Sequence, residues 1–221
     1  MKTWNEFIAY LETEINWDEP TQEQCLKVEE ALKKIIKYPE EIQQRCREIA
    51  TNEELFNDYK SHNQYPRITM DKFMLHMDTE DRFRVRLHRF KSKKHNGESV
   101  PKVHSHKWIY STIILAGSYR EKLWKVLETN EDTMEAKLEL IDQYMLNTGD
   151  TNSGLLDYAH QTINDSDDEH CITLFIRGKT LQKGAKIFNL DQGTFSYTFS
   201  PDKQLKEAYT SLSNYQFTFL P

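Results

Sequence analysis

Hydrophobic residues recur every three or four positions over residues 1 to about 62, which is the spacing of amphipathic helices. A first helix is expected behind Thr3, a residue suited to the N-cap, and its apolar face would carry Trp4, Phe7, Ile8, Leu11 and Ile15. A second helix is expected from Pro20 and Thr21 and a third from Pro39, because proline is favoured in the first turn of a helix. The pattern predicts an N-terminal helical arm, residues 1–65, that packs against the rest of the chain.

From about Arg67 onward the pattern changes to short β-branched and aromatic runs of strand length. These runs are 83–90, 108–115, 171–177, 193–200 and 215–221. Segments rich in Gly, Asn and Asp separate them, and residues 130–145 are expected to form a hairpin loop followed by a strand. Several short strands with turn signals favour a β-sandwich or barrel over a parallel α/β sheet. We therefore expect a mainly β protein with α-helices, in which one β-barrel domain, residues 66–221, follows the arm.

Composition and charge narrow the class of protein. The 221 residues include 29 Lys+Arg and 35 Asp+Glu, a net charge of −6, so nucleic acid is not an expected partner. The basic run Arg89–Lys94 is expected to be a solvated loop. No apolar stretch is long enough for a membrane span, and the acidic N-terminal segment does not resemble a signal peptide. Cys25, Cys46 and Cys171 are widely spaced, which predicts small buried residues without disulfides and a cytoplasmic location.

Candidate chemistry begins with the pair His104 and His106 at the start of an apolar run. Side chains at positions i and i+2 of a strand face the same way, so two imidazoles there can share one metal ion. A structural histidine pair has the same spacing, so the surrounding sequence has to decide. A second element follows, in which Gly149 and Asp150 form a turn and His160 stands eleven residues after the glycine.

Together these elements resemble the two motifs of the cupin superfamily. Six residues match at the right spacing: His104, His106 and Gly117 in the first motif, and Gly149, His160 and Asn164 in the second. The resemblance covers roughly residues 85–180. It implies a single cupin-type β-barrel (a double-stranded β-helix, or jelly roll) with a metal ion on His104, His106 and His160. Tyr110 stands where the first motif has its glutamate ligand.

Within that superfamily, the segment 104–124 is similar to cysteine dioxygenases and related thiol dioxygenases, which combine an N-terminal helical segment with a barrel. Those enzymes bind iron through three histidines without the glutamate, so the similarity implies Fe(II) and dioxygen here. Their Ser-x-His-x-Tyr strand is replaced by Thr173, Phe175 and Arg177, and Ser111 stands at the position of their crosslinking cysteine. Cysteine itself is therefore not the expected substrate.

Strand alternation nominates groups beside the metal. Tyr110 is expected to face the same way as the histidines, where it could hydrogen-bond a bound ligand or simply pack in the barrel. Arg86 and Arg177 are expected to face the cavity, opposite the aliphatic faces of their strands, and could clamp a substrate carboxylate. A surface or ion-paired role for these arginines stays open. His88 is expected to be a core or rim histidine rather than a fourth ligand.

The leading hypothesis is a cupin metalloenzyme, an Fe(II)-dependent three-histidine oxygenase of a small amino-acid-like or carboxylate substrate. Imidazole also suits Zn, Mn, Ni or Cu, which leaves a non-redox isomerase, lyase or hydrolase as a second hypothesis. The third is a non-enzymatic cupin that binds a small molecule. Aromatic residues near the C-terminus could form a homodimer face or fill barrel strands: Phe195, Tyr197, Phe199, Phe217 and Phe219.

Overall fold

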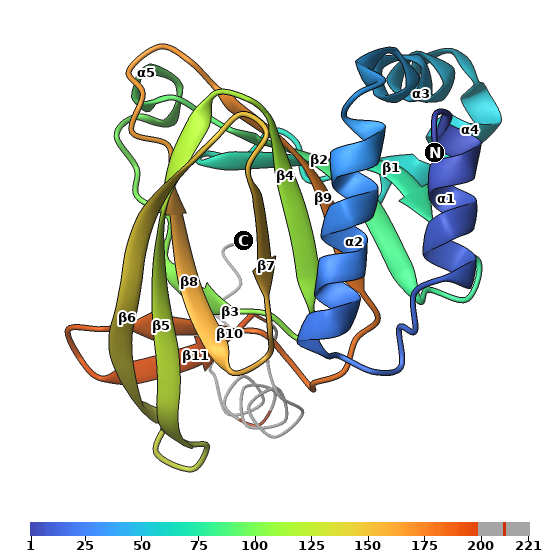
Figure 1. The fold of residues 1–221 in the computed structure, drawn as a ribbon. Coiled ribbons are helices and arrows are strands. Elements are labelled where there is room, and N and C mark those ends of the chain that lie inside the picture. The colour runs from blue at the N-terminus through green and yellow to red at the C-terminus, as the bar shows by residue number, and fades with distance from the viewer. Residues whose placement is uncertain (199–209, 211–221) are drawn as a thin grey trace, which may run out of the picture.

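The computed structural model of the chain describes residues 1–198 and residue 210 (Figure 1). The helices are α1 (Trp4–Thr13), α2 (Gln22–Ile35), α3 (Pro39–Thr51), α4 (Glu53–Lys60) and the short α5 (Lys93–Asn96). The strands are β1 (Met70–Met77), β2 (Phe83–Phe90), β3 (Val103–Ser105), β4 (Tyr110–Ala116), β5 (Ser118–Asn130), β6 (Glu135–Asn147), β7 (Thr151–Gly154), β8 (Tyr158–Ile163), β9 (Cys171–Gly178), β10 (Lys186–Asn189) and β11 (Thr194–Tyr197).

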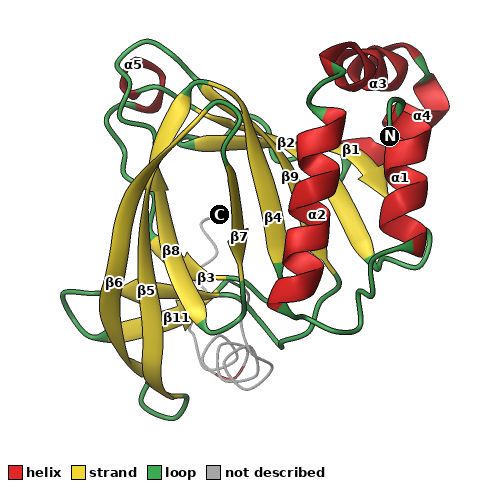
Figure 2. Ribbon diagram, in the orientation of Figure 1, coloured by secondary structure: helices red, strands yellow, loops and turns green. Residues whose placement is uncertain are grey.

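The strands form two antiparallel sheets. One has five strands in the order β1-β2-β9-β4-β7, and the other has the order β10-β11-β6-β5-β8-β3 and closes on itself because β3 also pairs with β10. Strand β4 runs through a tight turn at Gly117 directly into β5, so the chain passes from one sheet to the other at this point. Figure 2 shows α1–α4 gathered on one side of the molecule, with α2 lying against the five-stranded sheet, whereas α5 lies on the opposite side. The arrangement is mainly β with an N-terminal helical segment, as the sequence predicts.

The largest hydrophobic core lies between the helices and the five-stranded sheet. Leu11 of α1 and Leu32 of α2 are fully buried against apolar residues of the sheet, which include Val85, Leu174 and Ile176. These sheet residues alternate along β2 and β9 with residues that face the other way, as period-two strands require. Because the aliphatic face of the sheet packs against the helices, its polar and aromatic face points the other way, toward the interior of the molecule.

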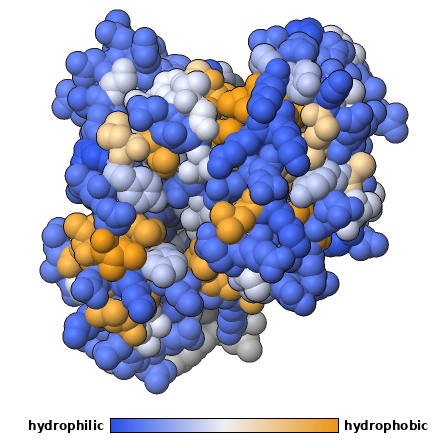
Figure 3. Space-filling view, in the orientation of Figure 1, coloured by the Kyte–Doolittle hydropathy of each residue, from blue (hydrophilic) through white to orange (hydrophobic). Residues whose placement is uncertain are grey.

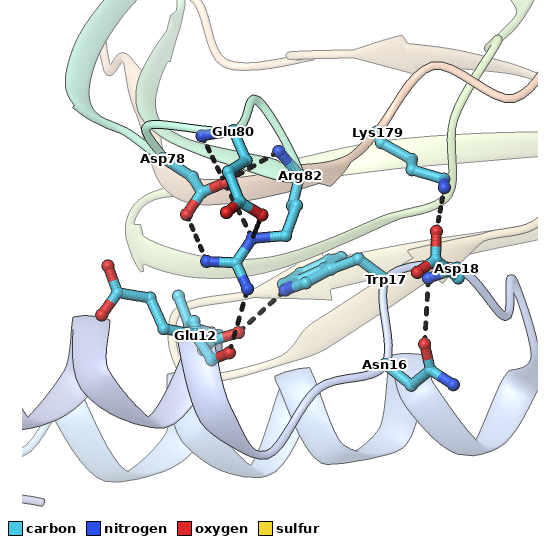
Figure 4. A network of polar contacts seen from close by, with 9 residues as sticks. Glu12, Asn16, Trp17, Asp18, Asp78, Glu80, Arg82 and Lys179 are labelled. Atoms are coloured by element: carbon cyan, nitrogen blue, oxygen red, sulfur yellow. Dashed lines mark hydrogen bonds and ion pairs between the residues drawn. The ribbon is translucent and has the colours of Figure 1, made fainter.

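A polar network holds the end of α1 against the turn between β1 and β2 (Figure 4). The guanidinium of Arg82 donates to both carboxylate oxygens of Asp78, at 2.7 and 3.0 Å, and to the carbonyl oxygen of Glu12 at 3.3 Å. The indole N–H of Trp17 donates to the carbonyl oxygen of Leu11 at 2.8 Å, which satisfies a carbonyl near the end of the helix. Lys179, just after β9, forms an ion pair with Asp18.

The expected helical arm is present as α1–α4, and the expected N-cap at Thr3 accepts a hydrogen bond from the backbone N–H of Glu6. Strands β2, β4, β9 and β11 lie within the expected runs or extend one residue beyond them, and β6 follows a hairpin turn. The strands β1, β5 and β10 were not expected, because their polar residues break the apolar run. The expected strand at 215–221 lies outside the described residues, as do Phe199, Phe217 and Phe219.

The basic run 89–94 is not the simple solvated loop that its composition suggests. Arg89 lies on β2 and pairs with the buried carboxylate of Asp71 at 2.6 Å. Lys93 begins α5 and, like Lys94, pairs with a carboxylate of the loop after β8: Asp167 and Asp168, respectively. Each of these cations has a carboxylate partner, so the run does not present a free basic surface.

Exposed apolar residues gather on the side of the molecule that β5 and β6 form (Figure 3). They include Leu127, Leu140, Ile141 and Met145, each more than 40% exposed. Phe195, in contrast, is buried and packs near Phe188, so this part of the C-terminal aromatic run fills the closed sheet. A homodimer stays a prediction. None of the helices in the described part of the chain is long and apolar enough to cross a membrane.

Candidate metal centre

Three histidines converge between the two sheets. His104 lies on β3, directly opposite His160 of β8, and His106 follows β3 by one residue. Their potential ligand nitrogens all lie within 4.8 Å of one another, and Nε2 of His106 is 2.8 Å from Nε2 of His160. Among the described residues this is the one group of three or more His, Cys, Asp or Glu side chains close enough to hold a metal ion. The structure thus brings together the three residues expected from the sequence.

The orientation of two of these rings is set by a second contact. Nδ1 of His104 lies 3.0 Å from the carbonyl oxygen of Lys102, and Nδ1 of His160 lies 2.5 Å from Oε1 of Glu121. A ring nitrogen that faces a carbonyl or carboxylate oxygen carries the proton, which leaves Nε2 as the nitrogen with a free lone pair. His106 is held differently, because its ring stacks on that of Trp108 with the ring centres 4.1 Å apart.

Electrostatics favours neutral rings. Burial lowers the pKa of His104 to about 3, with a further contribution from His160. Burial also lowers the pKa of His106 well below its ordinary value, and the neighbouring histidines act in the same direction. Because imidazole must be neutral to bind a metal, His104 and His106 are in the correct protonation state near neutral pH. Three converging imidazoles, two of which have a lone pair directed by a second contact, fit a divalent transition metal.

Glu121 is the residue of this site that sequence reasoning missed. It lies on β5, is 1% exposed, and accepts hydrogen bonds from His160, from Thr162 at 2.7 Å and from Asn152 at 3.3 Å. No Lys or Arg among the described residues pairs with this carboxylate. The cupin-like motif placed its glutamate at Tyr110, and β5 was not recognised as a strand. The available signal was alternation, because Glu121 shares a strand face with the buried Tyr119.

Tyr110 does lie beside the histidines. Its hydroxyl is 3.0 Å from Nδ1 of His160, and its ring stacks on Phe175 at 5.1 Å. The ring fills the space above Gly154 of β7, where a Cβ atom would overlap it. Burial raises the pKa of the phenol well above its usual value, and the nearby Glu121 carboxylate acts in the same direction, so the hydroxyl stays protonated.

A pocket of about 60 Å³ opens beside the histidines. Its wall consists of Thr69, Met70, Lys72, Arg86, His88, Phe90, Pro101, His104, His106, Trp108, Tyr110, Thr112, Tyr119, His160, Thr162, Thr173 and Phe175. Arg86 therefore faces the cavity as expected. No Asp or Glu is part of this wall, and its charged side chains are the cations Lys72 and Arg86.

Arg177, which is also expected to face the cavity, does not line the pocket. Its guanidinium donates to a carboxylate oxygen of Asp81 at 3.0 Å and to the carbonyl oxygen of Gly178 at 2.8 Å, and it is not part of the pocket wall. Position 177 lies on the inward face but two residues beyond Phe175, past the edge of the pocket. The ion-paired alternative therefore describes Arg177.

Asn164, which matched the second cupin motif, has a structural contact set. Its side-chain amide donates to the carbonyl oxygens of Phe90 and Glu169, at 3.1 and 2.8 Å. It thereby ties the loop after β8 to the end of β2 and does not face the histidines.

No family model matches the chain, and no curated protein matches it. Among solved structures, KdgF from Halomonas sp. is similar at 11% identity and a TM-score of 0.37, over 53% of this chain and 87% of that chain. Hydroxypropylphosphonic acid epoxidase from S. wedmorenis in complex with fosfomycin gives 10% identity and a TM-score of 0.37 over 52% of this chain and 53% of that chain. Hydroquinone 1,2-dioxygenase PnpCD in complex with Cd²⁺ and 4-hydroxybenzonitrile gives 11% and 0.35 over 48% and 62%, respectively.

The chain thus spans about half the length of the epoxidase and less than two thirds of the dioxygenase. TM-scores this low establish neither a family nor an activity.

Proposed function

We propose that this chain is a cupin-type metalloenzyme, an Fe(II)-dependent oxygenase of a small amino-acid-like or carboxylate substrate. The observation that carries the proposal is the convergence of His104, His106 and His160 at the wall of a pocket that Arg86 also faces. A protein that merely needed buried histidines would have no reason to place three of them with neighbouring ring nitrogens beside a cavity. The two sheets with the site between them support the jelly-roll arrangement within this proposal.

Each residue has a stated task. His104, His106 and His160 would hold the metal, and Glu121 and the carbonyl of Lys102 keep two of the rings oriented. When bound, iron supplies open positions at which a substrate and dioxygen can bind together. Tyr110 presents a protonated hydroxyl beside His160 and can donate a hydrogen bond to a ligand in the pocket. Phe175 and Trp108 are aromatic walls that exclude water from this region.

Arg86 is proposed to orient the substrate through its guanidinium. Nε of Arg86 is buried without a hydrogen-bond partner among the described residues, and Phe175 is its cross-strand partner on β9. A carboxylate accepts two parallel hydrogen bonds from a guanidinium, which would satisfy this donor. Arg177 is left out of the substrate role because Asp81 already occupies its guanidinium.

Metal analysis of the purified full chain tests the proposal, with His104→Ala and His160→Ala as test variants. We expect about one iron per chain in the wild-type protein after anaerobic loading, and loss of that iron in both variants. His95→Ala is the matched control, because His95 lies at the surface on α5, and this variant should bind iron normally. Failure of the wild-type chain to bind any metal would overturn the proposal and favour a metal-free binding protein.

Oxygen consumption separates the two enzyme classes. With iron loaded, small carboxylates and thiols should stimulate uptake of dioxygen, and Arg86→Met should raise the KM for an active carboxylate at least tenfold. Turnover without oxygen, with zinc, manganese or nickel in the site, would replace the oxygenase by a non-redox metalloenzyme.

A further inference from the structure

The pocket has a second polar group on the wall formed by the five-stranded sheet. Lys72 of β1, His88 of β2 and Thr173 of β9 are directly paired across three neighbouring strands, so their side chains stand in one row. Arg86 lies in the next row of the same face, two residues from His88. All four residues line the pocket. We call them the anion seat.

The anion seat holds most of the unsatisfied polar atoms of the described structure. Among all the described residues, five buried side-chain nitrogen or oxygen atoms lack a hydrogen-bond partner. Three of these five belong to the anion seat: Nε of Arg86, Nε2 of His88 and Oγ1 of Thr173. A buried polar atom without a partner costs about 1–3 kcal/mol, so three around one cavity indicate groups that a ligand is meant to satisfy.

The charges in the seat are also unbalanced. Lys72 and Arg86 form no ion pair with any described residue, whereas neighbouring cations such as Arg84 and Arg89 have carboxylate partners. Burial, followed by repulsion from Arg86, lowers the pKa of Lys72 to about 8, and burial lowers the pKa of Arg86 to about 10. No Asp or Glu lines the pocket to receive an ammonium group. The wall therefore suits negative charge and has nothing to hold the ammonium of a zwitterion.

We infer that Lys72, Arg86, His88 and Thr173 bind the anionic end of a small dianionic oxyanion, such as a dicarboxylate, and that Lys72 determines this charge preference. The inference rests on the proposed function, because it places the substrate in the same pocket. Phe175 separates the seat from the metal centre, with its ring centre 4.3 Å from that of His88 and 6.5 Å from that of His106. A ligand of a few carbon atoms is long enough to pass this ring and reach both groups. Lys72 and Arg86 together attract a doubly charged ligand more strongly than a singly charged one, and the hydroxyl and imidazole groups add hydrogen-bonding capacity.

Calorimetric titration of the chelator-treated full chain tests the inference without metal or turnover. The probes are malonate and its monoamide malonamate, which have nearly the same shape but differ by one negative charge. We expect malonate to bind at least about tenfold more tightly in the wild-type protein, and Lys72→Met to remove most of that preference. Lys72→Arg keeps the charge and should keep the preference. Lys125→Met, at an exposed position of β5, is the matched control and should behave like the wild-type chain.

Equal affinities of the two probes for the wild-type chain would overturn the inference, and so would a Lys72→Met variant that is folded and still prefers malonate. If Lys72→Met fails to fold, two other variants test the inference. Lys72→Arg should keep the preference for malonate over malonamate, and Arg86→Met should lose it. The proposed function fails separately. A chain that prefers malonate but binds no metal has the anion seat without the oxygenase, and an iron enzyme without the preference has the oxygenase without the seat.

Discussion

Oε1 of Glu121 lies 2.5 Å from Nδ1 of His160, and no Lys or Arg of the described residues pairs with this buried carboxylate. The contact fixes which nitrogen of His160 carries the proton and therefore which nitrogen faces the other two histidines. A buried carboxylate without Lys or Arg nearby is costly unless a positive charge approaches it. A divalent metal ion on His160 would supply that charge through the imidazole ring.

Glu121→Gln should therefore weaken metal binding by about 10- to 100-fold, because the amide keeps the shape of the side chain but loses its negative charge. Competition for metal with a chelator of known affinity measures the effect. Glu128→Gln, at an exposed position of the same strand, is the control and should leave the affinity unchanged. An unchanged affinity in Glu121→Gln would show that the carboxylate stabilises the fold without influencing the metal.

Tyr110 and Gly154 form a second dependent pair. A Cβ atom at position 154 would overlap the ring of Tyr110 and lie 2.8 Å from its hydroxyl oxygen, so Gly154→Ala should displace the phenol from His160. We expect a loss of about 2–3 kcal/mol in the free energy of unfolding, as in other overpacked cores. Urea denaturation measures it.

The control for this pair is a double-mutant cycle. In a Tyr110→Ala background the added methyl group has space, so Gly154→Ala should then cost less than about 0.5 kcal/mol. Equal costs in both backgrounds would mean that the tyrosine ring is not what requires glycine at this position.

Local patterns in the sequence were sufficient to predict α1–α3 and two of the three histidines that converge in the structure. The apolar spacing of α1 and α2 and the two faces of β2 depend on residues near one another in the chain. The same holds for His104 and His106, whereas His160 was placed through the spacing of a known motif. These features could be predicted because their physical cause is local periodicity.

The remainder of the site depends on pairings that no local pattern reveals. Lys72 faces the pocket because β1 pairs with β2, and β1 was not predicted since MDKFMLHM has mixed polarity. Arg86 and Arg177 have the same strand alternation, yet only Arg86 lines the pocket, because Asp81 in the turn before β2 pairs with Arg177. Which arginine meets a carboxylate of the chain is decided by tertiary structure.

His76 should make the stability of the protein depend on pH. Burial lowers the pKa of this β1 histidine to about 4, and Arg45 adds to the effect, whereas an unfolded chain has an ordinary histidine pKa near 6.5. Between these values the unfolded chain binds the proton and the folded chain does not. The free energy of unfolding is therefore highest above about pH 6.5 and decreases as the pH falls toward 4. The decrease due to His76 amounts to roughly 2–3 kcal/mol.

His76→Phe should flatten this part of the curve of unfolding free energy against pH, since phenylalanine can keep the stacking on Phe83 without binding a proton. Urea denaturation between pH 4 and 7 measures the slope. His62→Gln serves as the control at a histidine outside the core. A slope in His76→Phe equal to that of the wild-type chain would assign the acid sensitivity to other groups.

Leu32 of α2 should be essential to the stability of the sheet as well as the helix. It is fully buried in the core that contains Val85 and Ile113, so Leu32→Ala should cost about 2–5 kcal/mol. Leu26 lies on the same helix but is 51% exposed, and Leu26→Ala should cost no more than about 0.5 kcal/mol. The helical arm and the five-stranded sheet share one core. In Leu32→Ala, the unfolding transitions followed by far-ultraviolet circular dichroism and by tryptophan fluorescence should therefore shift together and coincide. Two separate transitions, with only the helical signal moved, would show that the arm folds independently of the sheet.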